Sequence, residues 1–412
     1  MDTTPLANRV AIGIFGRRNA GKSSLINALT GQEVSLISEV AGTTTDPVHK
    51  TMELLPLGPV VFYDTPGLDD EGDLGRARVE RALEVLRKTQ FAVVTVAANE
   101  GVTAFERDFL AQLKERGIPA LLVFNKTDLR AVPPEELAAL QKELGVPAAA
   151  VCARTGEGVN RLRELIAQNA KADDDELGLV NDLVPPGGTA VLVVPIDKAA
   201  PKGRLILPQQ QVIRDLLECD ATAVVVKEQE LRAALEKLRE KPDLVVTDSQ
   251  AFLKVGADTP PDVPLTSFSI LLARQKGDLA EMVKGIGRIA SLKEGERVLI
   301  AEGCTHHRQS DDIGTVKIPR WIRQMAGGGV EFEWTAGARF PEDLSPYAAV
   351  VHCGGCMLNR REMLWRMAQA KRQGVAVTNY GMLIAYVQGI LFRALGPFPA
   401  ARLAFERCGL KR

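Results

Sequence analysis

The chain has 412 residues, of which 46% are hydrophobic and 25% charged, with a formal net charge of −1. This length allows roughly two to four domains, and the balanced charge gives no electrostatic reason to expect nucleic acid or an anionic membrane as a partner. The N-terminus lacks a signal sequence, residues 381–392 are too short to span a bilayer, and six scattered cysteines indicate no disulfide framework, so we expect a cytoplasmic protein.

The first predicted elements are a strand over residues 9–15 and a helix over 24–29, joined by the glycine-rich loop GRRNAGKS. Strand, loop and helix in this order are typical of a phosphate-binding P-loop. Backbone N–H groups of the loop would surround the phosphates, Lys22 would reach the β and γ phosphates, and the Ser23 hydroxyl would hold Mg²⁺. The nucleotide contacts expected here are Gly16, Asn19, Ala20, Gly21, Lys22, Ser23 and Ser24.

Two polar segments beyond the P-loop fit a nucleotide switch. Residues 42–47 (GTTTDP) lie where a switch loop belongs, and Thr44 or Thr45 could cap Mg²⁺ and sense the γ phosphate. The next strand ends in Asp64, which can hold Mg²⁺ through water, and the Gly67 amide can meet the γ phosphate. The predicted catalytic residues are Lys22, Asp64 and Gly67.

Strands predicted over 91–97 and 120–124 continue this pattern, and the second ends in the sequence NKTD. Asp128 can accept two hydrogen bonds from the N1–H and 2-amino groups of guanine, which adenine cannot offer. The segment VCAR at 151–154 follows a further strand and can close over the base, with Cys152 as a small buried residue. The base contacts expected here are Asn125, Lys126, Asp128, Cys152 and Ala153.

These five motifs have the order and spacing of the translation-factor-like GTPases, which residues 1–171 resemble. Asn19 and the threonine-rich segment resemble the TrmE/Era-like subgroup, which uses K⁺ where other GTPases use an arginine finger. Leu68 stands where Ras-like proteins place the glutamine that orients water. The resemblance implies that the chain hydrolyses GTP to GDP and phosphate with Mg²⁺ and K⁺, and that the unaided reaction is slow.

A linker is predicted over 172–184, where an acidic run precedes a turn-rich segment, and a small α/β domain over 185–262. Its predicted strands are 189–196, 221–227 and 244–247, and its predicted helices are 209–218, 229–240 and 251–255. This alternation predicts a small parallel sheet. The domain holds no catalytic group of residues, and its small core favours pairing with a second copy as a homodimer.

Two short segments of the last predicted domain, residues 263–412, hold three of the six cysteines and three of the four histidines of the chain. The predicted helices are 265–272, 279–289, 359–372 and 382–395, and the predicted strands are 297–301, 330–334, 348–351 and 374–379. This alternation of strands and helices predicts a parallel, Rossmann-like α/β sheet. In such sheets, ligands lie at the carboxyl ends of the strands. The segments CTHH at 304–307 and HCGGC at 352–356 both follow such strands.

We therefore expect three thiolates to converge at one edge, with Gly354 and Gly355 forming the tight turn between Cys353 and Cys356. A zinc site with three Cys and one His, or a [4Fe–4S] cluster with one exchangeable iron position, would both fit this spacing. The neighbouring His307 is expected to lie at the surface or beside a ligand.

With these motifs in place, the whole chain resembles the HydF family of [FeFe]-hydrogenase maturation GTPases. The resemblance implies that Cys304, Cys353 and Cys356 bind a [4Fe–4S] cluster, and that His306 or His352 ligates its labile fourth iron or lies beside it. It further implies that a diiron precursor with CO, CN⁻ and a dithiolate bridge is received with the help of the maturases HydE and HydG. The precursor then passes to apo-[FeFe]-hydrogenase. The middle domain would form a dimer.

Two other functions remain as hypotheses. One is a regulatory GTPase with a structural Cys/His zinc site that acts on the ribosome or RNA, against which the balanced charge counts. The other is a redox enzyme, for which an exposed site with three thiolates is less suited than a closed site with four.

Overall fold

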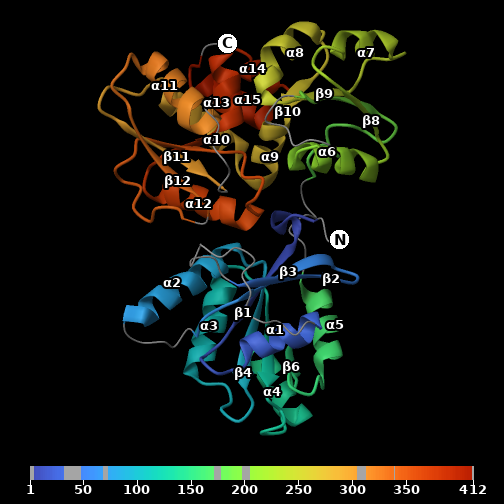
Figure 1. Ribbon diagram of the computed structural model, residues 1–412, viewed down its shortest axis with the longest axis vertical. Coiled ribbons are helices and arrows are strands. Elements are labelled where there is room, and N and C mark those ends of the chain that lie inside the picture. Colours follow the sequence, from blue (N-terminus) through green and yellow to red (C-terminus); the bar gives the residue numbers. More distant parts are fainter. Residues whose placement is uncertain are drawn as a thin grey trace. The chain divides into compact units, whose positions relative to one another are not determined.

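The computed structural model describes residues 4–31, 48–67, 73–170, 178–196, 205–303, 312–337 and 339–410. Contacts within the chain divide it into two compact units, Met1–Asp175 and Glu176–Arg412. Both units are built from strands that alternate with helices, and the predicted α/β class is confirmed (Figure 1). No helix of the described residues is both long enough and apolar enough to cross a bilayer.

The first unit contains a six-stranded sheet in the order β2-β3-β1-β4-β5-β6. The strands are β1 (Val10–Phe15), β2 (His49–Leu54), β3 (Gly58–Asp64), β4 (Phe91–Ala97), β5 (Ala120–Asn125) and β6 (Ala148–Ala150). All pairs are parallel except β2 with β3. Strands β1 and β4 are buried along their whole length, as expected for central strands covered on both faces.

Helices cover both faces of this sheet. They are α1 (Lys22–Thr30), α2 (Asp73–Lys88), α3 (Ala104–Glu115), α4 (Pro134–Leu144) and α5 (Val159–Asn169). On one face Leu25 of α1 and Leu162 of α5 belong to one apolar cluster. On the other face Phe15 and Phe109 of α3 meet with ring centroids 5.2 Å apart. This double covering leaves the carboxyl ends of the strands free for loops.

The second unit begins with a four-stranded parallel sheet in the order β10-β9-β7-β8, which confirms the predicted small parallel sheet. Its strands are β7 (Thr189–Val193), β8 (Thr222–Val226), β9 (Leu244–Thr247) and β10 (Leu265–Ser267), and its helices are α6 (Leu207–Glu218), α7 (Leu231–Lys237) and α8 (Phe252–Asp258). Strand β8 lies at one edge of the sheet and is half-buried to exposed, in contrast to the buried strand β7.

A second four-stranded parallel sheet of this unit has the order β12-β11-β13-β14. Its strands are β11 (Arg297–Glu302), β12 (Glu331–Ala336), β13 (Ala349–His352) and β14 (Ala376–Asn379). The helices are α9 (Phe268–Lys276), α10 (Leu279–Ala290), α11 (Ile318–Ala326), α12 (Arg360–Arg372), α13 (Tyr380–Val387), α14 (Leu391–Ala394) and α15 (Pro399–Arg407).

Two predicted helices were wrong in part. The segment 265–272 begins with strand β10, and only then continues as α9, because Ser267 caps that helix by accepting a hydrogen bond from the Ile270 N–H. The segment 382–395 is two helices, α13 and α14, separated around Gly389, because glycine is a poor helix former.

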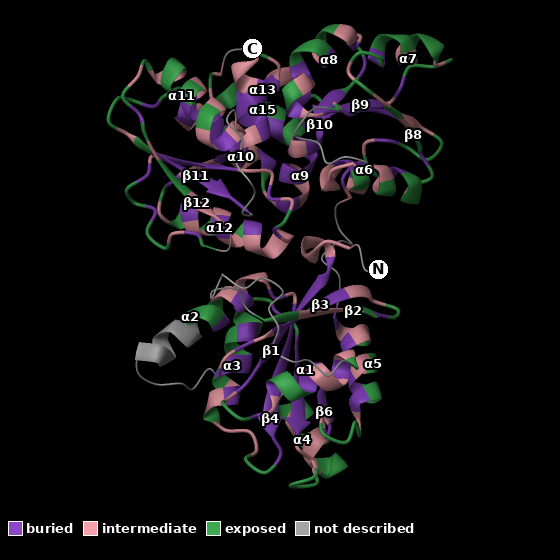
Figure 2. Cartoon of the chain, in the orientation of Figure 1, coloured by how far each residue is buried: buried purple, intermediate pink, exposed green. Residues whose placement is uncertain are grey.

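One apolar core joins the two sheets of the second unit, and its residues range from Leu179 to Phe405. Leu179, Val180 and Val184 belong to it, so the second part of the segment predicted as a linker is packed. Figure 2 shows buried residues in both sheets and in the helices between them. The predicted limits of the domains stay predictions.

Candidate functional site

The loop from Gly16 to Ser23 follows the carboxyl end of β1 and leads into α1. At Gly16 an added Cβ would lie 2.2 Å from the carbonyl oxygen of Thr95, so only glycine fits there. The buried Lys22 Nζ donates to the carbonyl oxygens of Gly16, at 3.0 Å, and Arg17, at 2.8 Å. Lys22 is thus held within the loop, and Asn19 lies on its exposed outer side with a φ of +60°.

Asp64 lies at the end of β3, next to the start of α1. The Ser23 hydroxyl donates to its Oδ2 at 2.5 Å, while its buried Oδ1 has no hydrogen-bond partner. Burial raises the pKa of Asp64, and the Ser23 hydroxyl and the Lys22 charge act against this rise. A hydroxyl and a carboxylate with a spare buried oxygen form a donor set suited to Mg²⁺, which prefers oxygen ligands.

The segment predicted to bind the base lies at the ends of β5 and β6. Asn125 joins it to the P-loop, because its Nδ2 donates to Ala20 O at 3.1 Å and its Oδ1 accepts from the Ala153 N–H at 3.0 Å. Asp128 accepts from the Cys152 thiol at 3.3 Å and pairs with Arg154 at 2.8 Å. Cys152 is buried, as predicted.

Arg17 and Glu106 form a contact of the P-loop that the sequence did not predict. Arg17 Nε donates to the fully buried Glu106 carboxylate at 2.7 Å, and the Thr103 N–H and hydroxyl donate to the same carboxylate. Burial raises the pKa of Glu106, but the hydrogen bonds from Thr103 and Arg17 outweigh burial and hold the pKa below its usual value. The P-loop is thereby fixed to the start of α3.

The cysteine-rich edge of the second unit lies at the ends of β11 and β13. The Cys353 N–H donates to Ala301 O at 2.8 Å, and the Gly303 N–H donates to Cys353 Sγ at 3.1 Å. The Gly355 N–H approaches the same sulfur at 3.4 Å. Burial raises the pKa of Cys353, and these two N–H groups act against it. A sulfur that accepts N–H groups at a strand end fits a thiolate ligand of a metal or cluster.

Both ring nitrogens of His352 are engaged. Nδ1 is 2.8 Å from Cys353 O, and Arg366 donates to Nε2 at 3.0 Å. The ring is buried, and burial together with the Arg366 charge lowers the pKa of His352 to about 3. The arginine, buried in α12, also donates to Gly337 O and Glu362. His352 therefore lies beside the cysteine turn with no free ring nitrogen for a metal.

Several predicted site residues lie outside the described residues: Thr44, Thr45, Leu68, Cys304, His306 and His307. The described residues contain no group of three or more Cys, His, Asp or Glu able to hold a metal. Of the three predicted cluster ligands, Cys353 and Cys356 are placed, three residues apart on one turn that begins beside Gly303.

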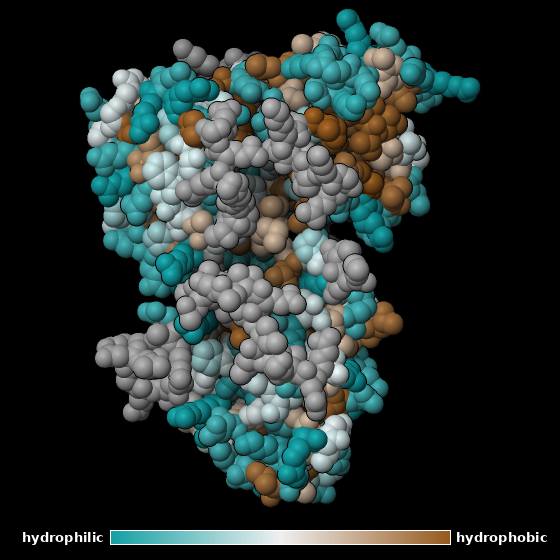
Figure 3. All heavy atoms as spheres, viewed as in Figure 1, coloured by the Kyte–Doolittle hydropathy of each residue, from teal (hydrophilic) through white to brown (hydrophobic). Residues whose placement is uncertain are grey.

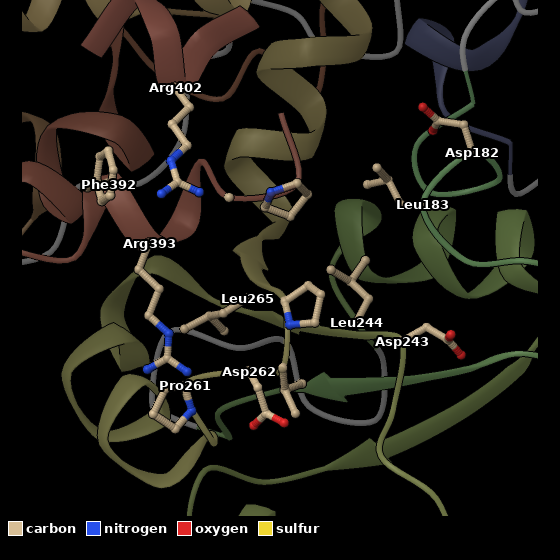
Figure 4. A pocket seen from close by; sticks show the side chains of 14 residues that line it. Asp182, Leu183, Asp243, Leu244, Pro261, Asp262, Leu265, Phe392, Arg393 and Arg402 are labelled. Atoms are coloured by element: carbon tan, nitrogen blue, oxygen red, sulfur yellow. The ribbon is translucent and has the colours of Figure 1, made fainter. Parts of the chain in front are cut away.

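A cavity of about 550 Å³ lies elsewhere in the second unit, where the β9–β10 region meets α14 and α15 (Figure 4). Arg402 and Arg393 line one side of it, and Asp262 and Asp243 are among the acidic residues that line it. The Arg393 guanidinium donates to the carbonyl groups of Gly256, Thr259 and Pro260. None of the predicted site residues that the structure describes lines this cavity.

Comparison with protein families assigns each part of the chain. The hydrogen maturase F dimerization domain matches residues 179–277, and the hydrogen maturase F tetramerization domain matches 280–397. The family model of the 50S ribosome-binding GTPase matches residues 11–126. The N-terminal unit is therefore a GTPase domain, whose reaction is the hydrolysis of GTP with Mg²⁺.

Individual relatives match part of the chain. The tRNA modification GTPase MnmE of Nitrosomonas europaea is 34% identical over 169 residues, which are 40% of this chain and 36% of that protein. GTPase Der of Kosmotoga olearia is 30% identical over 190 residues, 43% of each protein. The solved structure of Aquifex aeolicus Era with GDP·AlF4⁻ is 20% identical, with a TM-score of 0.34, and covers 52% of this chain and 93% of its own.

The chain thus spans less than half the length of these curated relatives. The two maturase domains, in contrast, together match more than half of the chain and lie C-terminal to the GTPase match. The chain belongs to the hydrogen maturase F family, with an N-terminal GTPase domain of the TrmE/Era-like type.

Proposed function

We propose that this chain is a GTP-hydrolysing scaffold that binds a [4Fe–4S] cluster and carries the diiron precursor of the hydrogenase active site to apo-[FeFe]-hydrogenase. The observation that carries the proposal is the half-buried Cys353 sulfur, which accepts a hydrogen bond from the N–H of Gly303, the residue before Cys304 in the sequence. Since β11 and β13 pair in register, residues that follow both strands lie at one edge. A regulatory GTPase with structural zinc is not favoured, because two maturase domains fill the second unit.

In the first unit, we assign Lys22 to the β and γ phosphates and Ser23 to Mg²⁺. Asp64 would hold a water ligand of Mg²⁺ through its unpartnered Oδ1, and the Gly67 amide would meet the γ phosphate. Of the base-binding residues, Asp128 would exchange its contact with Arg154 for hydrogen bonds to guanine. The other nucleotide contacts predicted at the P-loop and the switch are proposed to bind the same nucleotide.

K⁺ is proposed as the cation that stabilises the charge of the transition state, with Asn19 as its ligand in the P-loop. The exposed position of Asn19 on the outer side of the loop supports this role. Turnover of GTP measured in K⁺ and in Na⁺ tests it, with Asn19→Ala as the variant. Equal rates in the two ions would refute the role of K⁺ but not the assignment of GTP hydrolysis.

In the second unit, Cys304, Cys353 and Cys356 would hold the cluster, which supplies an iron site able to bind an exchangeable ligand. His306 remains a candidate for that position. His352 is assigned to the surroundings of the cluster, since both of its ring nitrogens have partners. The diiron unit is cargo, which HydE and HydG would help to assemble.

A homodimer is proposed through the edge strand β8. Among the described residues, no other strand pairs with the outer edge of β8, and natural proteins usually protect such edges. Figure 3 shows apolar side chains gathered around β8 and β9, and the exposed apolar residues of this region include Leu217 and Val225. A second copy placed along β8 would bury them.

Delivery to the hydrogenase provides the test of the function. The chain is loaded with the diiron precursor, mixed anaerobically with apo-[FeFe]-hydrogenase, and hydrogen evolution is measured. We expect activation by the wild-type chain and by the control Cys408→Ser, and loss of activation with Cys353→Ser. Full activation by Cys353→Ser would refute the assignment of this cysteine.

A further inference from the structure

Lys276, the last residue of α9, has a buried side chain that ends behind the cysteine turn. Its Nζ donates to Gly355 O at 3.0 Å and Leu358 O at 2.8 Å, and it lies 3.4 Å from Cys356 O. An ammonium group has three N–H donors, and the turn supplies three carbonyl acceptors. Lys276 therefore binds three of the residues that follow Cys353 in the sequence.

A lysine at this position needs an explanation because burying an ammonium group is costly without good acceptors. Lysine side chains normally keep the charged group in water. The position at the carboxyl end of α9 favours a cation, but this effect also acts on an exposed lysine. The carbonyl groups of the turn are the acceptors that offset the cost of burying this ammonium group.

The backbone groups at the cysteine turn contact two side chains, the Cys353 thiol and the Lys276 ammonium group. The Gly303 and Gly355 N–H groups approach Cys353 Sγ, whereas the carbonyl groups of 355, 356 and 358 accept from Lys276. A hydrogen bond from the Leu358 N–H to Gly355 O closes the turn. Lys276 thus binds carbonyl groups of the turn, while N–H groups at the turn approach the Cys353 sulfur.

We propose that Lys276 is a positioning residue of the cluster site, which fixes the turn from Cys353 to Leu358 and places a buried positive charge next to the cluster. The inference rests on the proposed function for its cluster, but the fixing of the turn concerns the protein alone. Fixed thiols bind a cluster without first losing conformational freedom. A nearby positive charge favours the reduced, more negative state of the cluster and raises its reduction potential.

The test compares Lys276→Met with Lys284→Met in the full chain. Methionine keeps the length of the side chain and removes the charge and the donors. Lys284 is an exposed lysine of α10 in the same unit, paired with Glu281. In the metal-free protein, the rate of alkylation of Cys353 and Cys356 by iodoacetamide is measured by peptide mass spectrometry. In the reconstituted protein, the reduction potential is measured by EPR-monitored titration.

For Lys276→Met we expect several-fold faster alkylation of the two cysteines and a more negative reduction potential, with Lys284→Met equal to wild type. Wild-type values of both quantities in Lys276→Met would overturn the proposal, as would an equal change in Lys284→Met. Should Lys276→Met not fold, as judged by circular dichroism, Lys276→Arg replaces it. Arginine keeps the charge but cannot aim three donors from one point, so faster alkylation supports the proposal and an unchanged rate overturns it.

The two hypotheses can fail separately. A wild-type chain that assembles no cluster refutes the proposed function, and alkylation of the metal-free protein still decides whether Lys276 fixes the turn. A wild-type chain with a cluster whose alkylation and potential do not depend on Lys276 refutes only the role of Lys276.

Discussion

Among the single residues of the cysteine turn, the two glycines differ although the sequence gives them equal status. Gly355 has a φ of +63°, and an added Cβ would lie 2.5 Å from Met363 Cε, whereas a Cβ at Gly354 would meet nothing within 4 Å. The prediction that both glycines form the turn therefore applies in full only to Gly355. The spacing of Cys353 and Cys356 predicts a turn but not which residue carries its left-handed conformation.

The difference between Gly355 and Gly354 provides a matched pair of variants, Gly355→Ala and Gly354→Ala. Gly355→Ala is expected to lower the free energy of unfolding by about 1 kcal/mol or more, because alanine is strained at positive φ. It should also lower the iron content of the reconstituted protein. Gly354→Ala should change both quantities little. Chemical denaturation and iron analysis measure them, and equal effects of the two substitutions would refute the assignment.

Arg366 of α12 is a second residue whose loss should be costly. Its guanidinium serves His352, Gly337 and Glu362 while its side chain is only 2% exposed. Arg366→Met should therefore lower the free energy of unfolding by about 2–4 kcal/mol, since the buried His352 ring and the half-buried Glu362 carboxylate lose their partner. Denaturation with urea measures the change. Arg372→Met, at the end of the same helix, is the control and should cost under about 1 kcal/mol.

Glu106 predicts a pH dependence of stability. Its folded pKa lies below its usual 4.5, so its ionised form stabilises the folded state above that pH. This contribution is lost as the pH falls from about 4.5 through the folded pKa. Glu106→Gln should cost about 2 kcal/mol at pH 7. The difference from wild type should shrink below pH 4.5 in denaturation curves, and a constant difference across that range would contradict the account.

At the scale of elements, the strands that carry the sites were predictable because each is a short run of mostly buried, mostly apolar residues. Strands β1, β4 and β11 came from such runs, and the polar loops after them marked their carboxyl ends. Strand β2 was missed because its sequence, HKTMEL, is largely polar and lies at an edge. Strand β10 was predicted as part of a helix because its three residues, LTS, lead without a break into the apolar helix α9.

The edge strand β8 carries the prediction for assembly. Val225 is 44% exposed on this strand, and a charge there would have to be buried in a dimer formed along β8. Val225→Lys should convert the dimer to a monomer at micromolar concentration, measured by analytical ultracentrifugation. Leu129→Lys, an exposed leucine of the first unit, should leave the dimer intact. A dimer that persists in Val225→Lys would place the interface elsewhere.

For the whole molecule, both predicted sites follow from one rule, since the carboxyl ends of parallel strands meet at one edge of a sheet. The P-loop, Asp64 and Asn125 lie at such ends in the first unit, and Cys353 lies at one in the second. Lys276 and Glu106 could not be predicted, because they reach their loops from helices 79 and 89 residues away in sequence. Such contacts depend on tertiary packing, which cannot be predicted from a local sequence motif.

The most direct test of the central claim is the iron, sulfide and zinc content of the anaerobically reconstituted chain, with an EPR spectrum after reduction by dithionite. The account predicts about four iron and four sulfide per chain. It also predicts a fast-relaxing S = 1/2 signal that is lost in Cys353→Ser and kept in Cys408→Ser. One zinc per chain, with no sulfide and no EPR signal, would contradict the account and leave a GTPase with a structural zinc site.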